Sequence, residues 1–517
     1  MSIKTFVKEH RIFLVILLFA LMLRLFFLPY AKFENETVRD LTLANQIIDQ
    51  KELRLKGISS EVDPASMQQS FGPLFYYMLA FSQLIYRHPY SVVGLIIAMT
   101  LIGVALFYFF IRSYYDDETA IFASALFAFS PWVFAFVSLN FATPSFLLFF
   151  VILLYFSLFK VVIDKKNSYL TLTAVALAAM LQIHLSSVLL LPISFFYLIL
   201  LRPSVFKSKH FLLALGVALL FFMPFIINAI QNHSFQNVFD FLFSSRTYVS
   251  RFENFRDSLA IPFMLATMYF GPYLLGSLRV FAFPVLEYIF IALDIAIVIA
   301  IGLGLLYILR RVIRNPDENR KVYILVLGWL ILPIILAIIP GANVSPHYMY
   351  ITYPSQFLLL AIFFKKFITN INLRRILFLS TIVVYLVYVV FFYFAVITNG
   401  GTDGIYGIPL RSKIDVLEYV SSHKPNGNLL FYSYVKPEYK YLQPYYAPNV
   451  NLFALNNDSR NSDGYLLLDF YSRGNFGEQE MTQKEQDFYQ NLPAVKIGQI
   501  SLVDVHDYKI ASLSNDS

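Results

Sequence analysis

The sequence predicts an all-α polytopic membrane protein with about eleven transmembrane helices and a small C-terminal α/β domain. Of the 517 residues, 58% are hydrophobic and only 14% are charged, and the mean hydropathy is +0.62, which a soluble protein of this length does not reach. Apolar runs of spanning length recur up to about residue 397, whereas residues 398–517 are polar and acidic. The chain contains no cysteine, so disulfide scaffolds, thiolate metal sites and cysteine nucleophiles are excluded.

Eleven runs are apolar and long enough to be read as spans. They are 11–30, 90–111, 120–138, 143–159, 168–183, 187–201, 211–230, 286–309, 322–340, 349–364 and 376–397. The segment 72–87 is also apolar, but counting it as a crossing would move the basic cluster 310–321 to the opposite side of the membrane. We therefore predict an interfacial or re-entrant helix there, beginning at Gly72-Pro73.

Basic residues determine the expected orientation. With a cytoplasmic N-terminus, the inner segments carry 19 of the 40 Lys and Arg residues, whereas the long segments 31–89 and 231–285 hold 6 and 4. Short cytoplasmic loops are enriched in Lys and Arg. The first run is expected to be a retained helix rather than a secretory signal, because it has no small-residue cleavage site and ten further spans follow. The sequence thus predicts a multi-pass cell-membrane protein with both long loops and the C-terminal domain outside the cell membrane.

The last 120 residues form the second predicted domain. Residues 398–517 carry ten Lys and Arg against fourteen Asp and Glu, an acidic excess that contrasts with the basic membrane module 1–397. The run 409–424 has helical periodicity, and 428–434, 449–455, 464–470 and 499–505 read as short strands.

Three carboxylates lie at the start of the first external loop. Glu34, Glu36 and Asp40 precede an amphipathic helix through Leu41 and Ile48. Glu36 and Asp40 are spaced i, i+4, so on a helix they share one face and suit a general base or an acceptor-positioning pair. Thr37 and Asp40 also fit a capping box, in which Asp40 would only satisfy helix-start amides. This alternative makes Glu36 the stronger catalytic candidate.

The loop resembles that of a known enzyme group. ETVRD (36–40), followed by SFGPLFYY (70–77), is similar to the first loop of polyprenyl-phosphate-sugar-dependent glycosyltransferases of the GT-C fold: protein O-mannosyltransferases, aminoarabinose transferases and bacterial family 39 relatives. NFATPS (140–145), QIH (182–184), MPF (223–225) and PHY (346–348) also look like that group. The leading acidic residue of the loop is usually Asp and here is Glu36, and Phe71 stands where the relatives often have His.

The resemblance implies transfer of a sugar, with inversion, from a polyprenyl-phosphate donor to a glycan, lipid or protein acceptor at the outer membrane surface. Glu36 and Asp40 would then be the catalytic carboxylates. Arg246, Arg251 and Arg256, three arginines within eleven residues of the second long loop, suit binding of the departing phosphate. His184, His347 and Tyr348 lie at outer span ends, where they could contact phosphate or acceptor, or serve as interfacial structural residues. The turn 139–143 has no carboxylate, so we expect no metal and no other cofactor; no nucleic-acid partner is expected.

Two other functions fit parts of the sequence. A transporter or flippase of a lipid-linked glycan would show paired halves and midplane charges, and the sequence shows few of the latter: Arg24, Glu287 and Asp294. Arg24 is expected either to snorkel outward or to face a cavity. An O-antigen polymerase or ligase of the other GT-C type would rely on a late external loop with arginines, which the segment 246–256 would supply.

Overall fold

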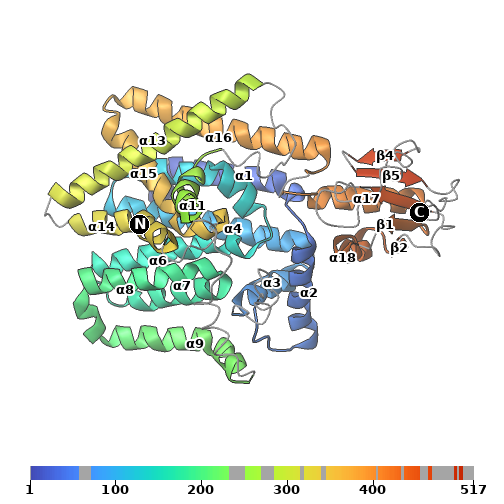
Figure 1. Ribbon diagram of the computed structural model, residues 1–517, viewed down its shortest axis with the longest axis horizontal. Helices are drawn as coiled ribbons and strands as arrows, with labels where there is room; N and C mark the ends of the chain where they lie inside the picture. The colour runs from blue at the N-terminus through green and yellow to red at the C-terminus, as the bar shows by residue number, and fades with distance from the viewer. Residues whose placement is uncertain are drawn as a thin grey trace.

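The computed structural model is a long helical bundle with a small sheet at one end (Figure 1). It describes residues 2–57, 72–231, 251–268, 284–314, 319–338, 345–402, 406–431, 436–454, 464–468, 494–497 and 500–504. The bundle helices of the first half are α1 (Ile3–Phe27), α4 (Pro89–Tyr114), α5 (Asp117–Phe129), α6 (Leu147–Val162), α7 (Tyr169–Ile183), α8 (Leu190–Leu201) and α9 (Lys209–Gln231). Those of the second half are α11 (Arg251–Met264), α13 (Pro284–Arg314), α14 (Arg320–Ile338), α15 (Tyr353–Phe367) and α16 (Ile371–Asn399).

Two further helices lie in the predicted first loop. They are α2 (Asn35–Gln50) and α3 (Leu74–Ile85), which pack against each other. At 1.5 Å per residue, the 12 residues of α3 reach only about 18 Å, well short of the apolar thickness of a bilayer. The predicted helix in 72–87 is therefore present and starts directly after Pro73 as expected, while its interfacial or re-entrant position stays a prediction.

Helix ends follow local chemistry. His88 caps α4, because its imidazole accepts from the Tyr90 N–H. Pro89 takes the first helical position of α4, which its fixed φ suits. Asp116 caps α5 by accepting from the Thr119 N–H at 3.0 Å. The helix α16 ends at Gly400, which takes a left-handed conformation with φ of 66° that favours glycine.

Among the described residues, six helices are long and apolar enough to cross a membrane. They are Lys4–Tyr30, Pro89–Tyr114, Thr143–Val162, Tyr288–Arg314, Arg320–Ile338 and Ile371–Asn399. Shorter apolar helices account for other predicted runs, so the count of about eleven crossings stays a prediction. Several runs are not single α-helices. Run 120–138 breaks at Ser130-Pro131 and continues as a π-helix (Val133–Ser138), because proline removes a backbone donor, and run 349–364 begins with a 3-10 helix (Pro346–Thr352).

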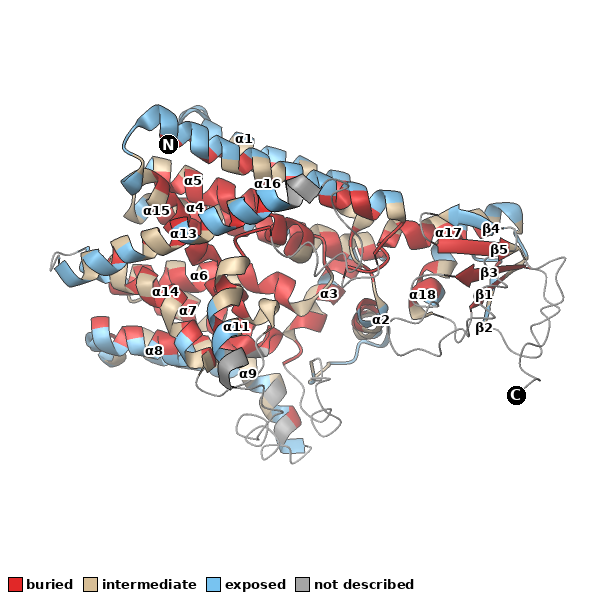
Figure 2. Ribbon diagram, turned by 45° about the horizontal axis from the view of Figure 1, so that its top comes forward, coloured by how far each residue is buried: buried red, intermediate tan, exposed pale blue. Residues whose placement is uncertain are grey.

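The core of the bundle is aromatic and tightly packed. Trp329 of α14 is fully buried, stacks on Tyr155 of α6 with ring centroids 3.9 Å apart, and donates its Nε1–H to the Ile351 carbonyl oxygen at 2.9 Å. By contrast, α1, α9, α13 and α16 expose large apolar side chains along their outward faces (Figure 2). A bundle with a buried core and an exposed apolar surface suits a lipid environment.

Close helix contact at one glycine gives a stability prediction. A Cβ added at Gly304 of α13 would lie 2.3 Å from the Leu359 carbonyl oxygen of α15, whereas a Cβ at Gly302 would meet nothing within 4 Å. We expect Gly304→Ala to lower the free energy of unfolding by about 1–3 kcal/mol through overpacking. Gly302→Ala is the matched control and should be neutral or stabilising, because alanine favours helix. Thermal unfolding in detergent measures both, and equal melting temperatures would contradict the prediction.

The segments predicted to face the cytoplasm lie together. Arg112 pairs with Glu9 and with Asp117, Lys365 pairs with Asp116 at 2.6 Å, and Arg374 pairs with Glu118 at 3.0 Å. Lys160 lies 5.2 Å from the Tyr114 ring centroid, and Lys321 donates to the Leu201 carbonyl oxygen at 3.1 Å. These contacts gather the N-terminus and the loops near 112–118, 160–166, 202–209, 310–321 and 365–375 at one end of the bundle. The predicted grouping of loops is therefore present, and which side of the membrane this end faces stays a prediction.

Two buried charges of the bundle have protein partners. Arg24 of α1 is fully buried and donates to Ser138 Oγ at 2.9 Å and to the Ala128 carbonyl oxygen at 2.8 Å, so the snorkelling alternative is wrong. Asp294 of α13 accepts from the Met268 N–H at 2.7 Å, which ties α13 to the chain after α11. The side chain of Glu287 lies outside the described residues.

The C-terminal unit is a mixed five-stranded sheet with two helices beside it (Figure 1). Its helices are α17 (Leu410–His423) and α18 (Pro437–Tyr446), and its strands are β1 (Asn428–Phe431), β2 (Asn451–Ala454), β3 (Gly464–Leu468), β4 (Ala494–Ile497) and β5 (Ile500–Asp504). The strand order is β2-β1-β3-β5-β4, with β1 parallel to both neighbours and β5 antiparallel to both of its own. The predicted helix and four strands are all present, while α18 and β4 were not predicted.

Candidate functional site

The acidic loop is held at its start by backbone pairing. The Lys32 N–H donates to the Leu139 carbonyl oxygen at 3.0 Å, which joins the loop to the turn between the π-helix and α6. Glu34 then caps α2: its side chain accepts from the Thr37 N–H, and Thr37 Oγ1 accepts from the Glu34 N–H at 3.4 Å. This reciprocal capping box fixes the first turn of α2, on which Glu36 lies.

The capping role considered for Asp40 is wrong. The helix begins at Asn35 with Glu34 as its cap, so Asp40 lies in the second turn, where no helix-start amide needs an acceptor. Glu36 is exposed, whereas Asp40 is only 6% exposed. Both lie on α2 at the predicted i, i+4 spacing, but they occupy different environments.

Asp40 is part of a buried polar cluster formed by α2 and α3. Its Oδ1 accepts from Arg39 Nε at 3.0 Å and from the Tyr76 hydroxyl at 3.3 Å. Burial, together with the nearby Asp40 carboxylate, raises the pKa of Tyr76 well above its usual value, so the hydroxyl stays protonated and donates. The carboxylate of Asp40 thus accepts from two donors in a buried site, whereas Glu36 lies on the exposed side of the same helix.

Arg54 adds a second positive charge beside this cluster. Its guanidinium carbon lies 5.1 Å from the Tyr76 ring centroid, and its carbonyl oxygen accepts from the Tyr77 hydroxyl at 2.9 Å. Within the described residues no carboxylate pairs with Arg54, and its Nε is buried without an acceptor. The sequence analysis missed Arg54 and the role of Tyr76. The FYY sequence at 75–77 was a signal for aromatic packing, but nothing in it indicated that Tyr76 would meet Asp40.

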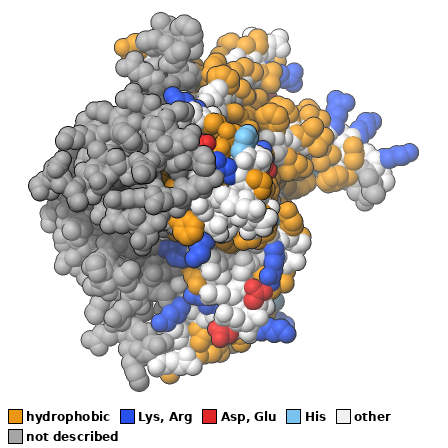
Figure 3. Space-filling model, turned by 90° about the vertical axis from the view of Figure 1, so that its right-hand side faces the viewer, with side chains coloured by type: hydrophobic (Ala, Val, Ile, Leu, Met, Phe, Trp, Pro, Cys, Tyr) orange, Lys and Arg blue, Asp and Glu red, His pale blue; other side chains and the backbone are white. Residues whose placement is uncertain are grey.

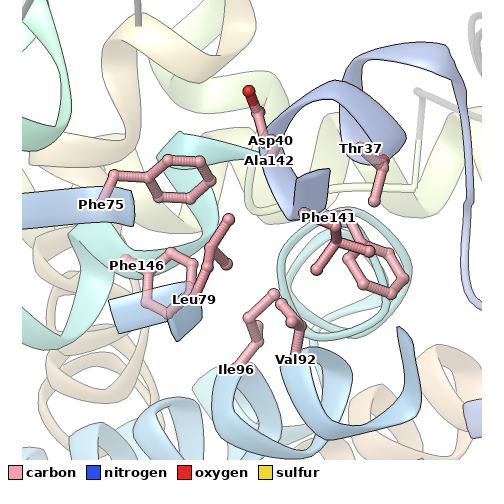
Figure 4. Close-up of a pocket in the computed structure, with 10 residues that line it drawn as sticks. Thr37, Asp40, Phe75, Leu79, Val92, Ile96, Phe141, Ala142 and Phe146 are labelled. Atoms are coloured by element: carbon pink, nitrogen blue, oxygen red, sulfur yellow. The ribbon is translucent and has the colours of Figure 1, made fainter. Parts of the chain in front are cut away.

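A small cavity borders Asp40 (Figure 4). Its volume is about 10 Å³, the space of roughly one water molecule. Phe75, Leu79, Phe141 and Phe146 surround it, and Asp40 lies at its rim. The cavity is too small for a sugar ring.

A second cluster joins the three residues predicted at outer span ends. His184 follows α7, and His347 and Tyr348 belong to the 3-10 helix Pro346–Thr352. The ring of His184 lies 5.3 Å from that of His347 and 5.5 Å from that of Tyr348. His184 Nδ1 lies 2.9 Å from Ser186 Oγ. The structure therefore brings together residues that are 163 positions apart in the sequence.

Burial controls the charge of both histidines. It lowers the pKa of His184 to about 3, with a further lowering from the neighbouring His347, and it lowers the pKa of His347 to about 4. Both imidazoles are therefore neutral at pH 7. They supply N–H donors to this surface rather than positive charge.

These depressed pKa values predict acid sensitivity. The unfolded chain binds protons at its histidines below about pH 6.5, whereas the buried His184 of the folded chain does not. The free energy of unfolding therefore decreases as the pH falls from 6.5 toward 3. The expected loss is about 1 kcal/mol per pH unit for a single histidine. We expect His184→Gln to unfold more easily than wild type at pH 7.5, and the gap in melting temperature to narrow by pH 5. The exposed His423→Gln is the control, and parallel profiles for wild type and His184→Gln would contradict the prediction.

The two clusters are linked through the start of α3. A Cβ placed on Gly72 would lie 2.3 Å from the Gln182 side chain, so only glycine allows this approach of α3 to the end of α7. Gln182 lies two residues before His184 in the sequence. It donates its Nε2–H to the Phe221 carbonyl oxygen of α9 at 2.9 Å. The acidic loop and the histidine cluster thus lie at one end of the bundle, the end that carries the C-terminal sheet. Figure 3 looks onto this end, where charged and hydrophobic side chains alternate on the described part.

Of the three predicted arginines, only Arg256 has a described side chain. Arg246 lies outside the described residues, and Arg251 begins α11 but its side chain is outside them. Arg256 is exposed on α11 and its Nε donates to Asp257 at 2.8 Å. The helix α11 packs against the 3-10 helix that contains His347. Among the described residues no three His, Asp or Glu side chains gather as a metal-binding group.

A segment of the chain matches a known family. Residues 70–227, from the end of the first loop through most of α9, match the model of the dolichyl-phosphate-mannose-protein mannosyltransferase family. The matched segment includes Gly72, Gln182 and His184. A search of curated protein sequences found no match.

Comparison with solved structures found similar chains. The structure of ArnT from Cupriavidus metallidurans bound to undecaprenyl phosphate aligns with 99% of this chain and 100% of its own, with a TM-score of 0.52 and 10% identity. The archaeal oligosaccharyltransferase AglB from Archaeoglobus fulgidus aligns with 86% of this chain and 61% of its own, with a TM-score of 0.45 and 14% identity. The arabinofuranosyltransferase AftD from Mycobacteria covers 86% of this chain and 32% of its own, with a TM-score of 0.41 and 14% identity.

The fold comparison and the family match agree with the resemblance seen in the loop motifs. The helical bundle with a C-terminal sheet has the fold of ArnT over its whole length, which confirms the expected GT-C architecture. The family match falls on the segment that joins the acidic loop to the histidine cluster. The chain has the GT-C fold, and its residues 70–227 match the model of the dolichyl-phosphate-mannose-protein mannosyltransferase family.

Proposed function

We propose that the protein transfers a sugar from a polyprenyl-phosphate donor to an envelope glycan, lipid or protein acceptor on the outer face of the cell membrane. One observation carries the proposal: an exposed carboxylate, an arginine that pairs with no carboxylate of the described segments, and a histidine pair lie at the same end of a GT-C bundle. Undecaprenyl phosphate bound to ArnT supports this class of donor. The basic loops at the opposite end support an outward-facing site, because positive charge marks the cytoplasmic side.

The reaction is a single displacement with inversion. Glu36 accepts the proton of the acceptor hydroxyl or amine as its oxygen or nitrogen bonds to the anomeric carbon of the sugar. The bond between that carbon and the phosphate oxygen breaks, and the electron pair leaves with the polyprenyl phosphate. The proton on Glu36 then passes to water.

The remaining residues fall into two roles. Asp40 orients Tyr76 and Arg39 through its two hydrogen bonds and stays an acceptor throughout. Arg54, with the arginines of α11, supplies positive charge for the departing phosphate, because guanidinium binds phosphate through paired N–H donors. The neutral His184 and His347 and the Tyr348 hydroxyl contribute hydrogen-bond donors, which stabilise developing charge without carrying charge themselves.

A deletion strain tests the proposal. Mass spectrometry of its polyprenyl-phosphate sugars and envelope glycans should show that one lipid-linked monosaccharide accumulates and that the same sugar disappears from a glycan. Wild type should reverse both changes. Retention of a complete lipid-linked oligosaccharide on the inner leaflet would instead support a transporter, and accumulation of unpolymerised or unligated repeat units would support a polymerase or ligase.

A further inference from the structure

The C-terminal unit reaches back to the acidic loop through one buried lysine. Lys413, in the first turn of α17, is 3% exposed, and its Nζ donates to the Phe33 carbonyl oxygen and to Glu438 Oε1, the latter at 3.1 Å. Glu438 belongs to α18 and is 9% exposed. A buried ammonium group needs acceptors for its N–H groups. The Phe33 carbonyl oxygen is thus one of the two acceptors that replace water around the buried ammonium group of Lys413.

The same short segment is fixed on both sides by backbone contacts. The Leu410 N–H, at the start of α17, donates to the Ala31 carbonyl oxygen at 2.9 Å, while Lys32 pairs with the turn at Leu139. The Tyr406 hydroxyl donates to the Tyr30 carbonyl oxygen at 2.6 Å. Segment 31–33 therefore runs between the membrane bundle and the C-terminal unit, and Lys32 forms isolated backbone bridges with Asn140 on one side and Pro409 on the other.

The side chain of Phe33 completes this attachment. It is fully buried, with its ring 5.7 Å from that of Phe141 and 6.3 Å from that of Tyr441 of α18. The Lys413 ammonium lies 5.8 Å from the Phe33 ring centroid, within the range of a cation–π contact. One residue thus receives contacts from the bundle, from α17 and from α18.

The position of Phe33 determines where the proposed catalytic turn begins. Glu34 follows it and caps α2, and Glu36 lies in the first turn of that helix. If the Phe33 carbonyl shifts, the cap and the first turn shift with it, because they are continuous backbone. Misplacement of a reacting group by about 1 Å can cost roughly 10²-fold in rate.

We propose that Lys413 is a positioning residue of the transferase site, and that the C-terminal unit fixes the acidic loop from outside the bundle. This inference rests on the proposed function, in which Glu36 is the base. Lys413 does not touch substrate. Its effect is exerted through the Phe33 carbonyl and the start of α2.

A set of variants separates positioning from simple stability. Lys413→Met removes the bond to Phe33 and leaves Glu438 as an unpaired buried charge. Lys413→Met combined with Glu438→Gln removes that unpaired charge but still lacks the bond to Phe33. Glu438→Gln alone keeps the Lys413 bond, and Lys440→Met, an exposed lysine of α18, is the matched control.

Transfer kinetics and hydrogen exchange measure the outcome. We expect Lys413→Met and the double variant to lower kcat about 10- to 100-fold, with KM for the polyprenyl-phosphate sugar within about twofold of wild type. Exchange of the amides of residues 34–40 should accelerate in both, while Lys440→Met behaves as wild type. The double variant should regain much of the melting temperature lost by Lys413→Met without regaining kcat, and Lys413→Arg should rescue part of the rate because guanidinium can still donate to Phe33.

Wild-type kcat together with wild-type exchange at 34–40 in the double variant would overturn the inference. If Lys413→Met fails to fold, the double variant and Glu438→Gln still decide whether Lys413 positions the acidic loop or only stabilises the fold. Absence of transfer by wild type itself would count against the proposed function instead. The exchange of residues 34–40 reports the positioning of α2 whatever the reaction is.

Discussion

Replacing Glu36 by Gln is expected to reduce sugar transfer by about 10²- to 10⁴-fold, the range for losing a general base. Glu36 is exposed on the first turn of α2, so the substitution removes a proton acceptor and leaves the helix in place. The loss should appear in kcat, since the amide keeps its size and polarity but cannot accept the proton of the acceptor. The measurement is transfer from the purified polyprenyl-phosphate sugar, alongside complementation of the deletion strain.

The loop offers a matched control. Glu52 is also exposed, lies just after α2 and is distant from Asp40 in sequence, so Glu52→Gln should transfer at the wild-type rate. Glu36→Asp should retain part of the activity, because related loops carry Asp at this position. Full complementation by Glu36→Gln would remove Glu36 from the catalytic role and leave Asp40 as the carboxylate to test.

The largest expected effect on stability is at Arg24. We expect Arg24→Met to lower the free energy of unfolding by about 2–4 kcal/mol, because hydrogen bonds to a charged group are among the strong ones and their acceptors are buried. The variant leaves the Ala128 carbonyl oxygen, at the end of α5, without its donor inside an apolar bundle. The guanidinium also lies 4.9 Å from the Phe134 ring centroid. Methionine carries no charge, so it cannot replace this cation–π contact.

Unfolding in mixed micelles with increasing SDS measures this effect. Arg11→Met is the control, since Arg11 lies on the same helix but is exposed. Only the Arg24 variant should unfold at a lower SDS fraction. Equal midpoints for the two variants would show that the contacts of Arg24 with Ser138 and Ala128 contribute nothing to stability.

Periodicity and charge were enough to predict most helices of the bundle and the grouping of its basic loops. An interfacial helix at 72–87 was predicted because a crossing there would have separated the basic loops. The helix α3 lies in this range, and the ion pairs from Arg112 to Glu9 and from Arg374 to Glu118 show those loops gathered at one end. Helix interruptions were harder. The break at Ser130-Pro131 is visible in the sequence, but the π-helical continuation depends on packing rather than on composition.

The candidate site was only partly predictable. His184, His347 and Tyr348 were each chosen as residues at outer span ends, and their meeting needed the fold of the bundle. Asp40 was given a possible capping role because Thr37-x-x-Asp40 fits the pattern, whereas Glu34 takes that role by local hydrogen bonding. Arg54 and Tyr76 were not found, because neither residue belongs to a spacing pattern that indicates a partner.

The sequence by itself determined the membrane class, the grouping of the loops, the position of the acidic segment and the existence of a C-terminal α/β unit. These properties depend on hydropathy, charge and short-range periodicity, which are written along the chain. Only the tertiary structure decided which carboxylate is exposed, that the two histidines are neutral neighbours, and that Lys413 binds the Phe33 carbonyl 380 residues away. Those properties depend on burial and on contacts between distant segments, and no local pattern records how distant segments meet.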